Sequence, residues 1–512
     1  MNLSVGKILR TGRFKRIALP FLLGALTVLG FAPFYFFPIP LLTLAILFYL
    51  WLHADTKRGT FLIGFMFGLG LFGFGASWVY VSLHDFGMMP LPLAVLATLL
   101  YCAFLALFPA MAGWLQASLK GPTIWRLLAV MPASFVLYEW TLGWIFTGFP
   151  WLTLGYSQAP ASGLIGYAPL LGVYGVSLML AVSAGLIAFA YEARQTKTRR
   201  TGLALFGLLA LWIWGAGLQS IAWTKASGAP LTVSLLQGNI SQDLKWREDR
   251  LSSTLATYRE MILASKSQLI ILPETAVPQF YDRVPPAYLE ELAQHARRQG
   301  SDIILGIPER DLVQRAYYNS VLSLGTAPTQ FYRKQHLVPF GEFIPLKPVF
   351  GWIMETMQIP LTDFARGAPT QRPLAVAGQQ VAMNICYEDV FGEEIIRQLP
   401  QATLLVNVSN DAWFGDSIAP RQHLQISQMR ALESGRYMLR ATNTGLTAIV
   451  NEKGRILAQA PVFQATTLHG KAQGRSGSTP YVRWGNIPFL ILVSGVLVIG
   501  LVVLSRSACQ RI

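Results

Sequence analysis

Charged residues are scarce in this chain. Asp, Glu, Lys and Arg make up 13% of its 512 residues, whereas hydrophobic residues make up 53%. Soluble globular proteins carry about 25% charged residues, so the deficit excludes an ordinary soluble protein and indicates membrane-spanning segments. The chain is also too long for one average domain.

Acidic residues are the rarer sign, and the net charge of +15 raises the question of a nucleic-acid partner. Residues 226–485 hold 25 Lys and Arg against 22 Asp and Glu, whereas the rest of the chain holds 16 against 4. The excess positive charge therefore belongs to the apolar parts. No basic stripe with interleaved aromatic residues is present, and this disfavours nucleic-acid binding.

Apolar residues cluster in eight segments. Most reach the length of about 20 residues that a helix needs to cross a bilayer, and the first two, which are shorter and separated by prolines, are interpreted as two spans. The segments cover residues 17–31, 39–52, 60–83, 90–117, 124–142, 163–191, 203–222 and 486–504. The basic start of the chain resembles a signal peptide but lacks a small-x-small cleavage site, so we interpret it as an uncleaved anchor.

The basic residues outside the soluble part indicate an orientation. With eight spans, every cluster of Lys and Arg falls on one side of the membrane, and only Lys225 lies on the other. Because basic loops stay in the cytoplasm, both termini are predicted to be cytoplasmic. The block between spans seven and eight is then predicted to lie outside, in the periplasm or its equivalent.

Three parts follow from this pattern: residues 1–225 with spans one to seven, a soluble domain at 226–485, and a final span with a cytoplasmic tail at 486–512. In the soluble domain, β-rich runs alternate with helical stretches, which predicts an α/β layered fold. The expected strands are Leu231–Leu236, Gln268–Leu272, Ile303–Ile307, Ser320–Leu324, Gln330–Tyr332, Gln380–Ile385, Leu404–Val408 and Thr447–Val450, and the expected helices are Arg250–Ser265, Pro286–Gln299 and Gln422–Ser434. Residues 470–480, rich in Gly and Ser, are interpreted as a flexible linker.

Cysteine is rare as well, and its distribution excludes a disulfide within the chain. Cys102 falls inside a predicted span and Cys509 in the tail, so Cys386 is the one cysteine of the outer domain. A lone thiol in an oxidising compartment risks unwanted oxidation. Two interpretations stay open at this point: a buried structural cysteine or a catalytic nucleophile.

The position of Cys386 favours catalysis. It directly follows an apolar run, and Glu274 and Lys334 stand at the ends of two other apolar or β-rich runs. A carboxylate can take the proton of a thiol and later give it to a leaving group, and an ammonium can stabilise an oxyanion. Taken singly, Glu274 and Lys334 are also compatible with surface charges, so their convergence at one sheet edge is a hypothesis.

Around these residues the chain resembles the nitrilase superfamily of carbon–nitrogen hydrolases, and within it the membrane-anchored apolipoprotein N-acyltransferases. The resemblance covers nearly the whole chain. It is carried by Gly-Phe-Pro-Trp-Leu at 148–152, Leu-Lys-Trp at 244–246, His-Leu-Val-Pro-Phe-Gly-Glu-Phe at 336–343, Ile-Cys-Tyr-Glu at 385–388 and Val-Ser-Asn-Asp-Ala-Trp-Phe-Gly at 408–415.

The resemblance implies a bundle of about eight transmembrane helices joined to an αββα sandwich. It assigns Cys386 as nucleophile, Glu274 as base and then acid, and Lys334 as oxyanion stabiliser. It further implies supporting roles for Glu342, Tyr387 and Glu388, and a lipid-binding role for Trp246 and Trp151. No cofactor and no metal are expected.

The implied reaction transfers a fatty acyl chain in the bacterial inner membrane. The expected donor is a membrane phospholipid, phosphatidylethanolamine in particular, and the acyl chain passes through a thioester on Cys386. The expected acceptor is the α-amine of the N-terminal S-diacylglyceryl-cysteine of a lipoprotein. Excluding water from the site would protect the thioester from hydrolysis.

Two alternatives belong to other classes. A membrane-tethered carbon–nitrogen hydrolase acting on a small substrate would explain Glu274, Lys334 and Cys386 but leaves seven preceding spans without a purpose. A transporter would place ionisable residues within its spans. Here only Glu139 qualifies, and since it is near the end of its segment it can also be explained by contact with interfacial water.

Overall fold

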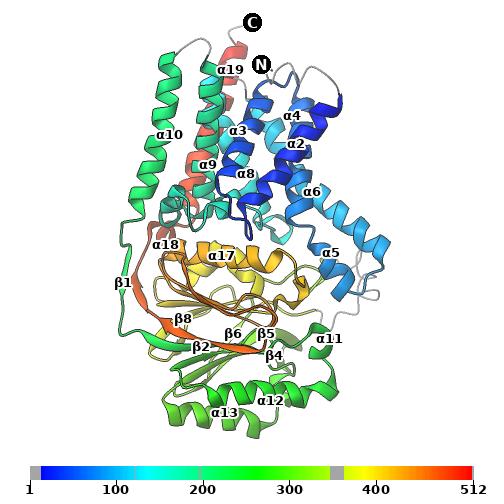
Figure 1. Ribbon diagram of the computed structural model, residues 1–512, viewed down its shortest axis with the longest axis vertical. Coiled ribbons are helices and arrows are strands. Elements are labelled where there is room, and N and C mark those ends of the chain that lie inside the picture. The colour runs from blue at the N-terminus through cyan, green and yellow to red at the C-terminus, as the bar shows by residue number, and fades with distance from the viewer. Residues whose placement is uncertain (1–12, 120, 195–197, 346–362, 510–512) are drawn as a thin grey trace. The chain divides into compact units, whose positions relative to one another are not determined.

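The computed structural model of the chain describes residues 13–119, 121–194, 198–345 and 363–509. The chain divides into two compact units. Figure 1 shows the chain coloured by residue number. One unit comprises Met1–Val79, Val95–Ile221 and Trp484–Ile512, and the other comprises Tyr80–Ala94 and Ala222–Arg483.

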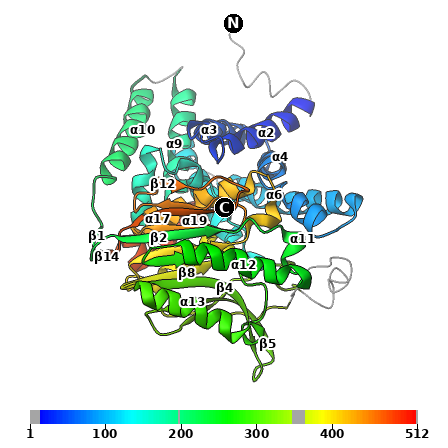
Figure 2. The same cartoon turned by 60° about the horizontal axis from the view of Figure 1, so that its bottom comes forward.

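The first unit is built from helices that pack side by side (Figures 1 and 2). Its longer helices are α2 (Arg13–Thr27), α3 (Pro38–Leu52), α4 (Lys57–Gly75), α6 (Leu91–Ser118, from Val95 onward), α8 (Met131–Leu142), α9 (Ala168–Ala193), α10 (Thr198–Leu218) and α19 (Ile487–Cys509). By length and composition, four helices of the described chain can cross a membrane: Lys57–Gly75, Leu91–Ser118, Gly163–Ala193 and Thr198–Leu218. Three shorter apolar helices are Ile17–Gly30, Pro38–Leu52 and Ile487–Val502. The number of about eight spans therefore stays a prediction.

Glycine brings α2 and α4 together. A Cβ on Gly24 would lie 1.9 Å from the carbonyl oxygen of Phe67, and one on Gly70 would lie 2.0 Å from that of Phe21. No larger residue fits at either position without moving a backbone. Such close approach increases van der Waals contact between helices that have no hydrophobic drive to associate in lipid.

Glu139 of α8 lies inside the first unit and is 2% exposed, so it is packed rather than open to water. Its Oε1 accepts a hydrogen bond of 2.8 Å from the backbone N–H of Leu154. That residue begins the 3₁₀ helix Leu154–Gln158, whose first N–H groups need acceptors from outside the helix. The contact gives Glu139 a structural role in the fold of this unit.

The second unit contains two six-stranded sheets and one short ribbon. The first sheet has the order β13-β2-β3-β4-β5-β6 and the second has the order β12-β11-β10-β9-β8-β7. The strands of the first are β2 (Leu231–Gln237), β3 (Leu269–Ile271), β4 (Asp302–Asp311), β5 (Ala316–Gly325), β6 (Phe331–Arg333) and β13 (Thr466–Ala472). Those of the second are β7 (Leu374–Val376), β8 (Gln379–Ile385), β9 (Leu404–Ser409), β10 (Met438–Thr442), β11 (Ala448–Val450) and β12 (Ile456–Gln459). The ribbon pairs β1 (Thr224–Ala226) with β14 (Arg475–Gly477).

The two sheets face each other between two layers of helices (Figures 1 and 2). The central core takes buried side chains from both sheets, such as Leu235 of β2 and Val406 of β9. On the outer face of the first sheet, α12 (Glu248–Ala264) and α13 (Pro286–Gln299) cover a second core. On the outer face of the other sheet, α17 (Ala419–Ser434) covers a third. These cores define the four layers of an αββα sandwich.

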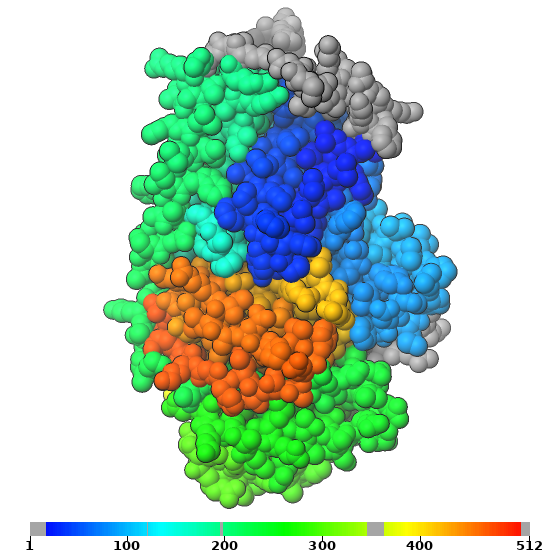
Figure 3. All heavy atoms as spheres, in the orientation of Figure 1, coloured from blue at the N-terminus to red at the C-terminus, as the bar shows by residue number. Residues whose placement is uncertain are grey.

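The prediction of a flexible linker at residues 470–480 is wrong. Gly470, Lys471 and Ala472 belong to β13 and pair antiparallel with β2, and the following β14 pairs with β1. Backbone pairing does not depend on side-chain character, so the Gly- and Ser-rich composition misled the interpretation. In Figure 3 the segment around β12 and β13, coloured orange, lies on the surface of the second unit, and β12 itself is largely exposed.

Candidate active site

Three predicted site residues stand just beyond strands of the second unit. Glu274 follows β3, Lys334 comes directly after β6, and Cys386 comes directly after β8. Strand β3 runs parallel to both of its neighbours, and β8 runs parallel to β9. Gly306 of β4 leaves room for the Glu274 segment, because a Cβ there would lie 2.4 Å from the backbone nitrogen of Thr275.

A buried cluster forms around the ammonium of Lys334, which is 1% exposed. Its Nζ lies 2.9 Å from Oε1 of Glu342 and 3.4 Å from Oε1 of Glu274. Asn319 of β5 donates through Nδ2 to the same two oxygens, at 2.7 Å for Glu274 and 2.8 Å for Glu342. The structure therefore brings Glu274, Lys334 and Glu342 together. The sequence reasoning missed Asn319, whose one signal is an amide within a strand whose interior is buried.

The cluster sets the charges of its members. Burial opposes the charge on Lys334, but Glu342 and Glu274 outweigh it and raise the pKa of the lysine above its ordinary value. Burial likewise opposes the charge on Glu274, but Lys334 and Lys245 outweigh it and lower the pKa of that carboxyl. At neutral pH, Glu274 is therefore a carboxylate that can accept a proton and Lys334 is a cation.

Glu274 is also held from its other side. Its Oε2 accepts 2.8 Å from the backbone N–H of Asn410, and its main-chain oxygen accepts 3.1 Å from Nζ of Lys245. Lys245 ends the short helix α11 (Gln242–Lys245) and is buried. It stands within the Leu-Lys-Trp run of the resemblance, but nothing in the sequence singled it out from its neighbours.

Cys386 is a free, partly exposed cysteine in an unusual backbone conformation. Its φ of 54° lies in the left-handed region, which costs a non-glycine residue energy and occurs often at functional sites. Nδ2 of Asn407 donates to its carbonyl oxygen at 3.0 Å. Burial and the charge of Glu274 raise the pKa of the thiol, while Lys334 opposes that increase. The sulfur is therefore a thiol at neutral pH and needs a base to become a nucleophile.

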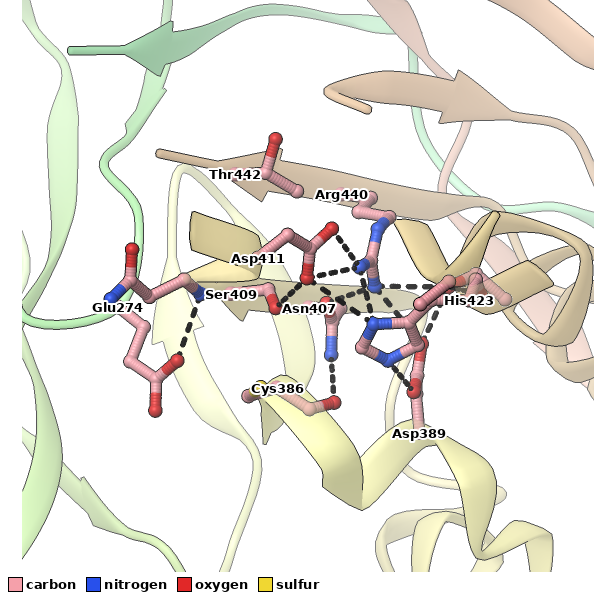
Figure 4. A network of polar contacts seen from close by, with 12 residues as sticks. Glu274, Cys386, Asp389, Asn407, Ser409, Asp411, His423, Arg440 and Thr442 are labelled. Carbon is pink, nitrogen blue, oxygen red and sulfur yellow. Dashed lines mark hydrogen bonds and ion pairs between the residues drawn. The ribbon is translucent and has the colours of Figure 1, made fainter. Parts of the chain in front are cut away.

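A second charged cluster lies near Cys386, above it and to its right in Figure 4. Arg440 of β10 contacts Asp411 at 2.9 Å and Asp389 at 3.2 Å, and its Nη1 donates to Oδ1 of Asn407 at 2.6 Å. His423 of α17 completes the cluster with Nε2 2.7 Å from Oδ1 of Asp389. Nδ1 of His423 lies 2.7 Å from Arg440 and 3.3 Å from Oδ1 of Asp411. Burial and Arg440 oppose a charge on the imidazole, but Asp389 and Asp411 outweigh them and raise the pKa of His423.

This Arg440 cluster is connected to Cys386 and to Glu274. Through Asn407 it holds the carbonyl of Cys386. Through Asp411 it holds Ser409, whose hydroxyl donates to that carboxylate at 2.7 Å and also hydrogen-bonds the thiol. Ser409 is followed by Asn410, the backbone donor to Glu274. In Figure 4, Glu274 lies to the left of Ser409 and Cys386 lies below it. The sequence reasoning missed this cluster because its members are far apart along the chain.

The supporting residues Glu388 and Tyr387 follow Cys386 in a short helix, Cys386–Val390. Glu388 is buried and joins two elements: it accepts from the backbone N–H groups of Ile385 at 2.6 Å and Gln335 at 2.7 Å, and from the hydroxyl of Tyr332 at 3.0 Å. Burial raises the pKa of Glu388 to about 7 in spite of these donors. Glu388 thus ties the end of β8 to the segment that carries Lys334.

The two tryptophans lie in different units. Trp246 follows α11 directly, next to Lys245, and is partly exposed. Trp151 belongs to the first unit, is 1% exposed and packs against Trp78 and Phe149 with ring centroids 5.0 and 6.1 Å away. A lipid-binding role for either residue stays a prediction. Within the described ranges, no group of three or more His, Cys, Asp or Glu side chains is arranged to hold a metal ion.

Comparison with known proteins gives matches over both units. Residues 23–186 match the model of the apolipoprotein N-acyltransferase N-terminal domain, and residues 232–481 match the model of the carbon–nitrogen hydrolases. An apolipoprotein N-acyltransferase of Nitrosomonas europaea is 56% identical over 489 residues, which are 96% of this chain and 97% of the relative. That of Methylococcus capsulatus is 46% identical over 476 residues, 93% of each chain. That of Chromobacterium violaceum is 45% identical over 492 residues, 96% of this chain and 94% of the relative.

Proposed function

The chain belongs to the apolipoprotein N-acyltransferase family, and we propose that it moves a fatty acyl chain from a membrane phospholipid to a lipoprotein through a thioester on Cys386. The proposed donor is phosphatidylethanolamine. The proposed acceptor is the α-amine of the S-diacylglyceryl-cysteine at the N-terminus of the lipoprotein.

The first step forms the thioester. Glu274 takes the proton of the Cys386 thiol, and the sulfur attacks the ester carbonyl of the phospholipid. Negative charge develops on the carbonyl oxygen, and Lys334, two of whose N–H donors already contact carboxylates, offers its remaining donor to that oxygen. The lysophospholipid then leaves with the proton that Glu274 returns.

In the second step the amine is the nucleophile and Cys386 is the leaving group. Glu274, again a carboxylate, takes a proton from the lipoprotein amine as the nitrogen attacks the thioester carbonyl. The carbon–sulfur bond breaks, the amide forms, and the thiol of Cys386 regains a proton. Glu342 keeps Lys334 in place through their 2.9 Å contact and through Asn319, which bonds both carboxylates.

One observation carries this proposal: a buried ammonium holds two carboxylates beside a thiol whose backbone is in the left-handed region. Burial and Glu274 raise the pKa of the thiol, whereas the lysines lower the pKa of Glu274. Resting proton transfer is therefore unfavourable. A bound substrate favours the reaction by adding an oxyanion-stabilising contact with Lys334 in the transition state.

The test uses purified full-length protein in phospholipid vesicles without an acceptor. Wild type should accumulate an acyl group on Cys386 that hydroxylamine removes, detected by intact mass. Adding a diacylglyceryl lipopeptide with a free N-terminus should discharge the acyl group as an amide. An N-acetylated lipopeptide should leave it in place, because no amine nucleophile remains.

The carbon–nitrogen hydrolase match keeps a second candidate in view, a membrane-tethered amidase. This candidate predicts rapid release of free fatty acid, or hydrolysis of small amides, with no lasting adduct. If wild type released fatty acid quickly and the lipopeptide did not change the rate, water would be the natural acceptor and the transferase proposal would be wrong.

We also propose that the second unit lies in the periplasm and that both termini are cytoplasmic. The one-sided distribution of Lys and Arg supports this orientation. A reporter fused after Leu231 should give a periplasmic signal, and one fused after Arg511 should give a cytoplasmic signal. A cytoplasmic signal at Leu231 would contradict the proposed location.

A further inference from the structure

Lys245 is a buried lysine with few polar contacts. It is 4% exposed, and within the part of the chain that the structure describes its Nζ makes one hydrogen bond, 3.1 Å to the main-chain oxygen of Glu274. Among the described residues no carboxylate oxygen lies within 4.0 Å of it. Lys334, by contrast, contacts both Glu274 and Glu342 within that distance. Since burying an ammonium without a counter-ion is costly, its counter-charge must come from the reaction or from a group farther away.

The two carboxylates and two lysines of the active site sum to zero net charge only when Lys245 is included. Glu274 and Glu342 carry two negative charges, and Lys334 carries one positive charge. Moving a proton from Cys386 to Glu274 breaks the S–H bond, forms an O–H bond and transfers one negative charge from the carboxylate to the sulfur. Without Lys245 the cluster would carry a net charge of −1 both before and after this transfer, and the sulfur anion would have the ammonium of Lys334 alone to stabilise it. Lys245 brings the net charge to zero and adds a second cation that favours the thiolate.

We propose that Lys245 is a positioning residue that supplies the second positive charge of the active site and stabilises Cys386 as a thiolate while it fixes the main chain of Glu274. The inference rests on the proposed role of Cys386 as the nucleophile. It assigns to the residue before Trp246 a function in the chemistry rather than in lipid binding.

The charged groups that face Lys245 come from several elements. Glu274 follows β3, Cys386 follows β8, and Lys334 with Glu342 lies beyond Glu274, whereas Asp243 of α11 itself is exposed. Burial lowers the pKa of Lys245 to about 8, and Glu274 and Cys386 oppose that decrease. Lys245 is therefore mostly charged at neutral pH and loses its charge a little above it, which gives its effect a recognisable pH dependence.

The experiment measures how fast iodoacetamide alkylates Cys386 in the full-length protein in detergent, between about pH 6 and pH 10. Peptide mass spectrometry reports the modification at Cys386 itself, and Cys386→Ala gives the background. Two variants divide the roles of the lysine. Lys245→Met removes both its charge and its hydrogen bond, whereas Lys245→Gln removes the charge but keeps an amide donor for the carbonyl of Glu274. Lys266→Met removes one exposed lysine from the same unit as a matched control.

We expect Lys245→Met and Lys245→Gln to react about tenfold more slowly than wild type near neutral pH, which corresponds to a thiol pKa about one unit higher. The difference should disappear above about pH 9, where wild type has lost the charge of Lys245. Lys266→Met should follow wild type throughout. Melting temperatures identify a variant that fails to fold. If Lys245→Met fails to fold, Lys245→Gln remains as the second test, because its amide keeps a polar group at the buried position.

Three results would overturn the inference. A Lys245→Gln profile equal to that of wild type would reduce the lysine to a structural hydrogen bond. A slowdown of the same size at every pH would indicate a distorted site rather than a lost charge. If Cys386 of wild type showed no specific alkylation at any pH, its role as nucleophile would fail and this inference with it; a reactive wild type with unshifted variants would overturn the role of Lys245 alone.

Discussion

The second unit buries two charged clusters, which differ in the cation at their centre and in their contact with the thiol of Cys386. One has two carboxylates on the ammonium of Lys334, and the other has two carboxylates on the guanidinium of Arg440. Both are almost closed to water. The Lys334 cluster lies beside a thiol and a second lysine, so protons can move within it. The Arg440 cluster is linked to Cys386 by hydrogen bonds through Asn407 and Ser409.

The difference comes from the cation. A guanidinium keeps its charge at every accessible pH and presents several donors in a plane, whereas an ammonium is a compact charge whose pKa shifts when it is buried. Arg440 accordingly makes contacts to two aspartates, Asn407 and His423 that fix a local geometry. We infer that the Arg440 cluster holds the backbone of Cys386 in place and that the Lys334 cluster performs the proton transfers.

The largest effect should come from removing the group between the two clusters. Cys386→Ala should carry no acyl adduct under any condition, because the proposed nucleophile is absent. Cys386→Ser should at most hold an ester with very slow turnover, since a hydroxyl is far less acidic than a thiol. Intact mass after incubation with phospholipid measures both outcomes, with Cys102→Ala as the control that keeps its adduct. An adduct on folded Cys386→Ala would place the acyl group on another residue.

Arg440→Met should unfold the protein more easily. Without the guanidinium, Asp389 and Asp411 are left buried and uncompensated, and breaking a buried ion pair in this way costs about 3–5 kcal/mol of folding stability. The melting temperature and the denaturant midpoint of the full chain in detergent measure the loss. Arg455→Met, at an exposed position, should stay within about 0.5 kcal/mol of wild type. Equal stability of the two variants would remove the structural role of the Arg440 cluster.

Lys334→Met should lose much of the reaction rate and little of the folding stability, the reverse of Arg440→Met. Loss of one oxyanion donor costs about 10²–10³ in rate, while Glu274 and Glu342 can share a proton and so limit the loss of stability. Lys334→Arg should fail as well, because the two cations differ in shape and reach. The rate of thioester formation and the melting temperature, measured on the same samples, separate these effects. Nearly normal acylation by folded Lys334→Met would remove Lys334 from the mechanism.

The smallest effect is a pH dependence within the Arg440 cluster. Burial opposes the charge of Asp411, but Arg440 outweighs it and lowers the pKa of the carboxyl below its ordinary value of about 3.9. A lowered folded-state pKa contributes stability that is present above the unfolded-state value and is lost as the pH falls. Asp411→Asn should therefore cost about 1–3 kcal/mol at neutral pH. The difference from wild type should shrink below about pH 4, and a constant difference down to pH 3 would contradict this assignment.

Much of the fold was predictable from local pattern. The helix Pro286–Gln299 was predicted with the bounds it has, and the strand expected at Leu231–Leu236 ends one residue later, at Gln237. The strand expected at Ser320–Leu324 is longer, Ala316–Gly325, because its polar first half pairs with β4 along the whole length. β10 was not expected, since Arg440 interrupts its apolar pattern. That arginine can be buried because Asp389 and Asp411 form ion pairs with it.

Some residues of the candidate site were predictable from the sequence and others were not. Glu274, Lys334 and Cys386 could be proposed from the sequence because each ends an apolar or β-rich run, and such ends lie at a sheet edge. Glu342, Tyr387 and Glu388 came only from the resemblance. Asn319 and Lys245 gave no usable signal, because an isolated amide or lysine has the same appearance in a sequence whether it is solvated or buried.

The sequence by itself determined the local patterns of this protein: the apolar segments, the excess of positive charge outside residues 226–485 and the alternation of strands and helices, all of which depend on residues that are close along the chain. The tertiary structure decided which charges share a site. Lys334 and Glu274 are 60 residues apart and Arg440 and Asp411 are 29 apart, yet each pair is in contact. Electrostatic energies depend on distance and burial in the folded chain, and neither quantity is contained in sequence spacing.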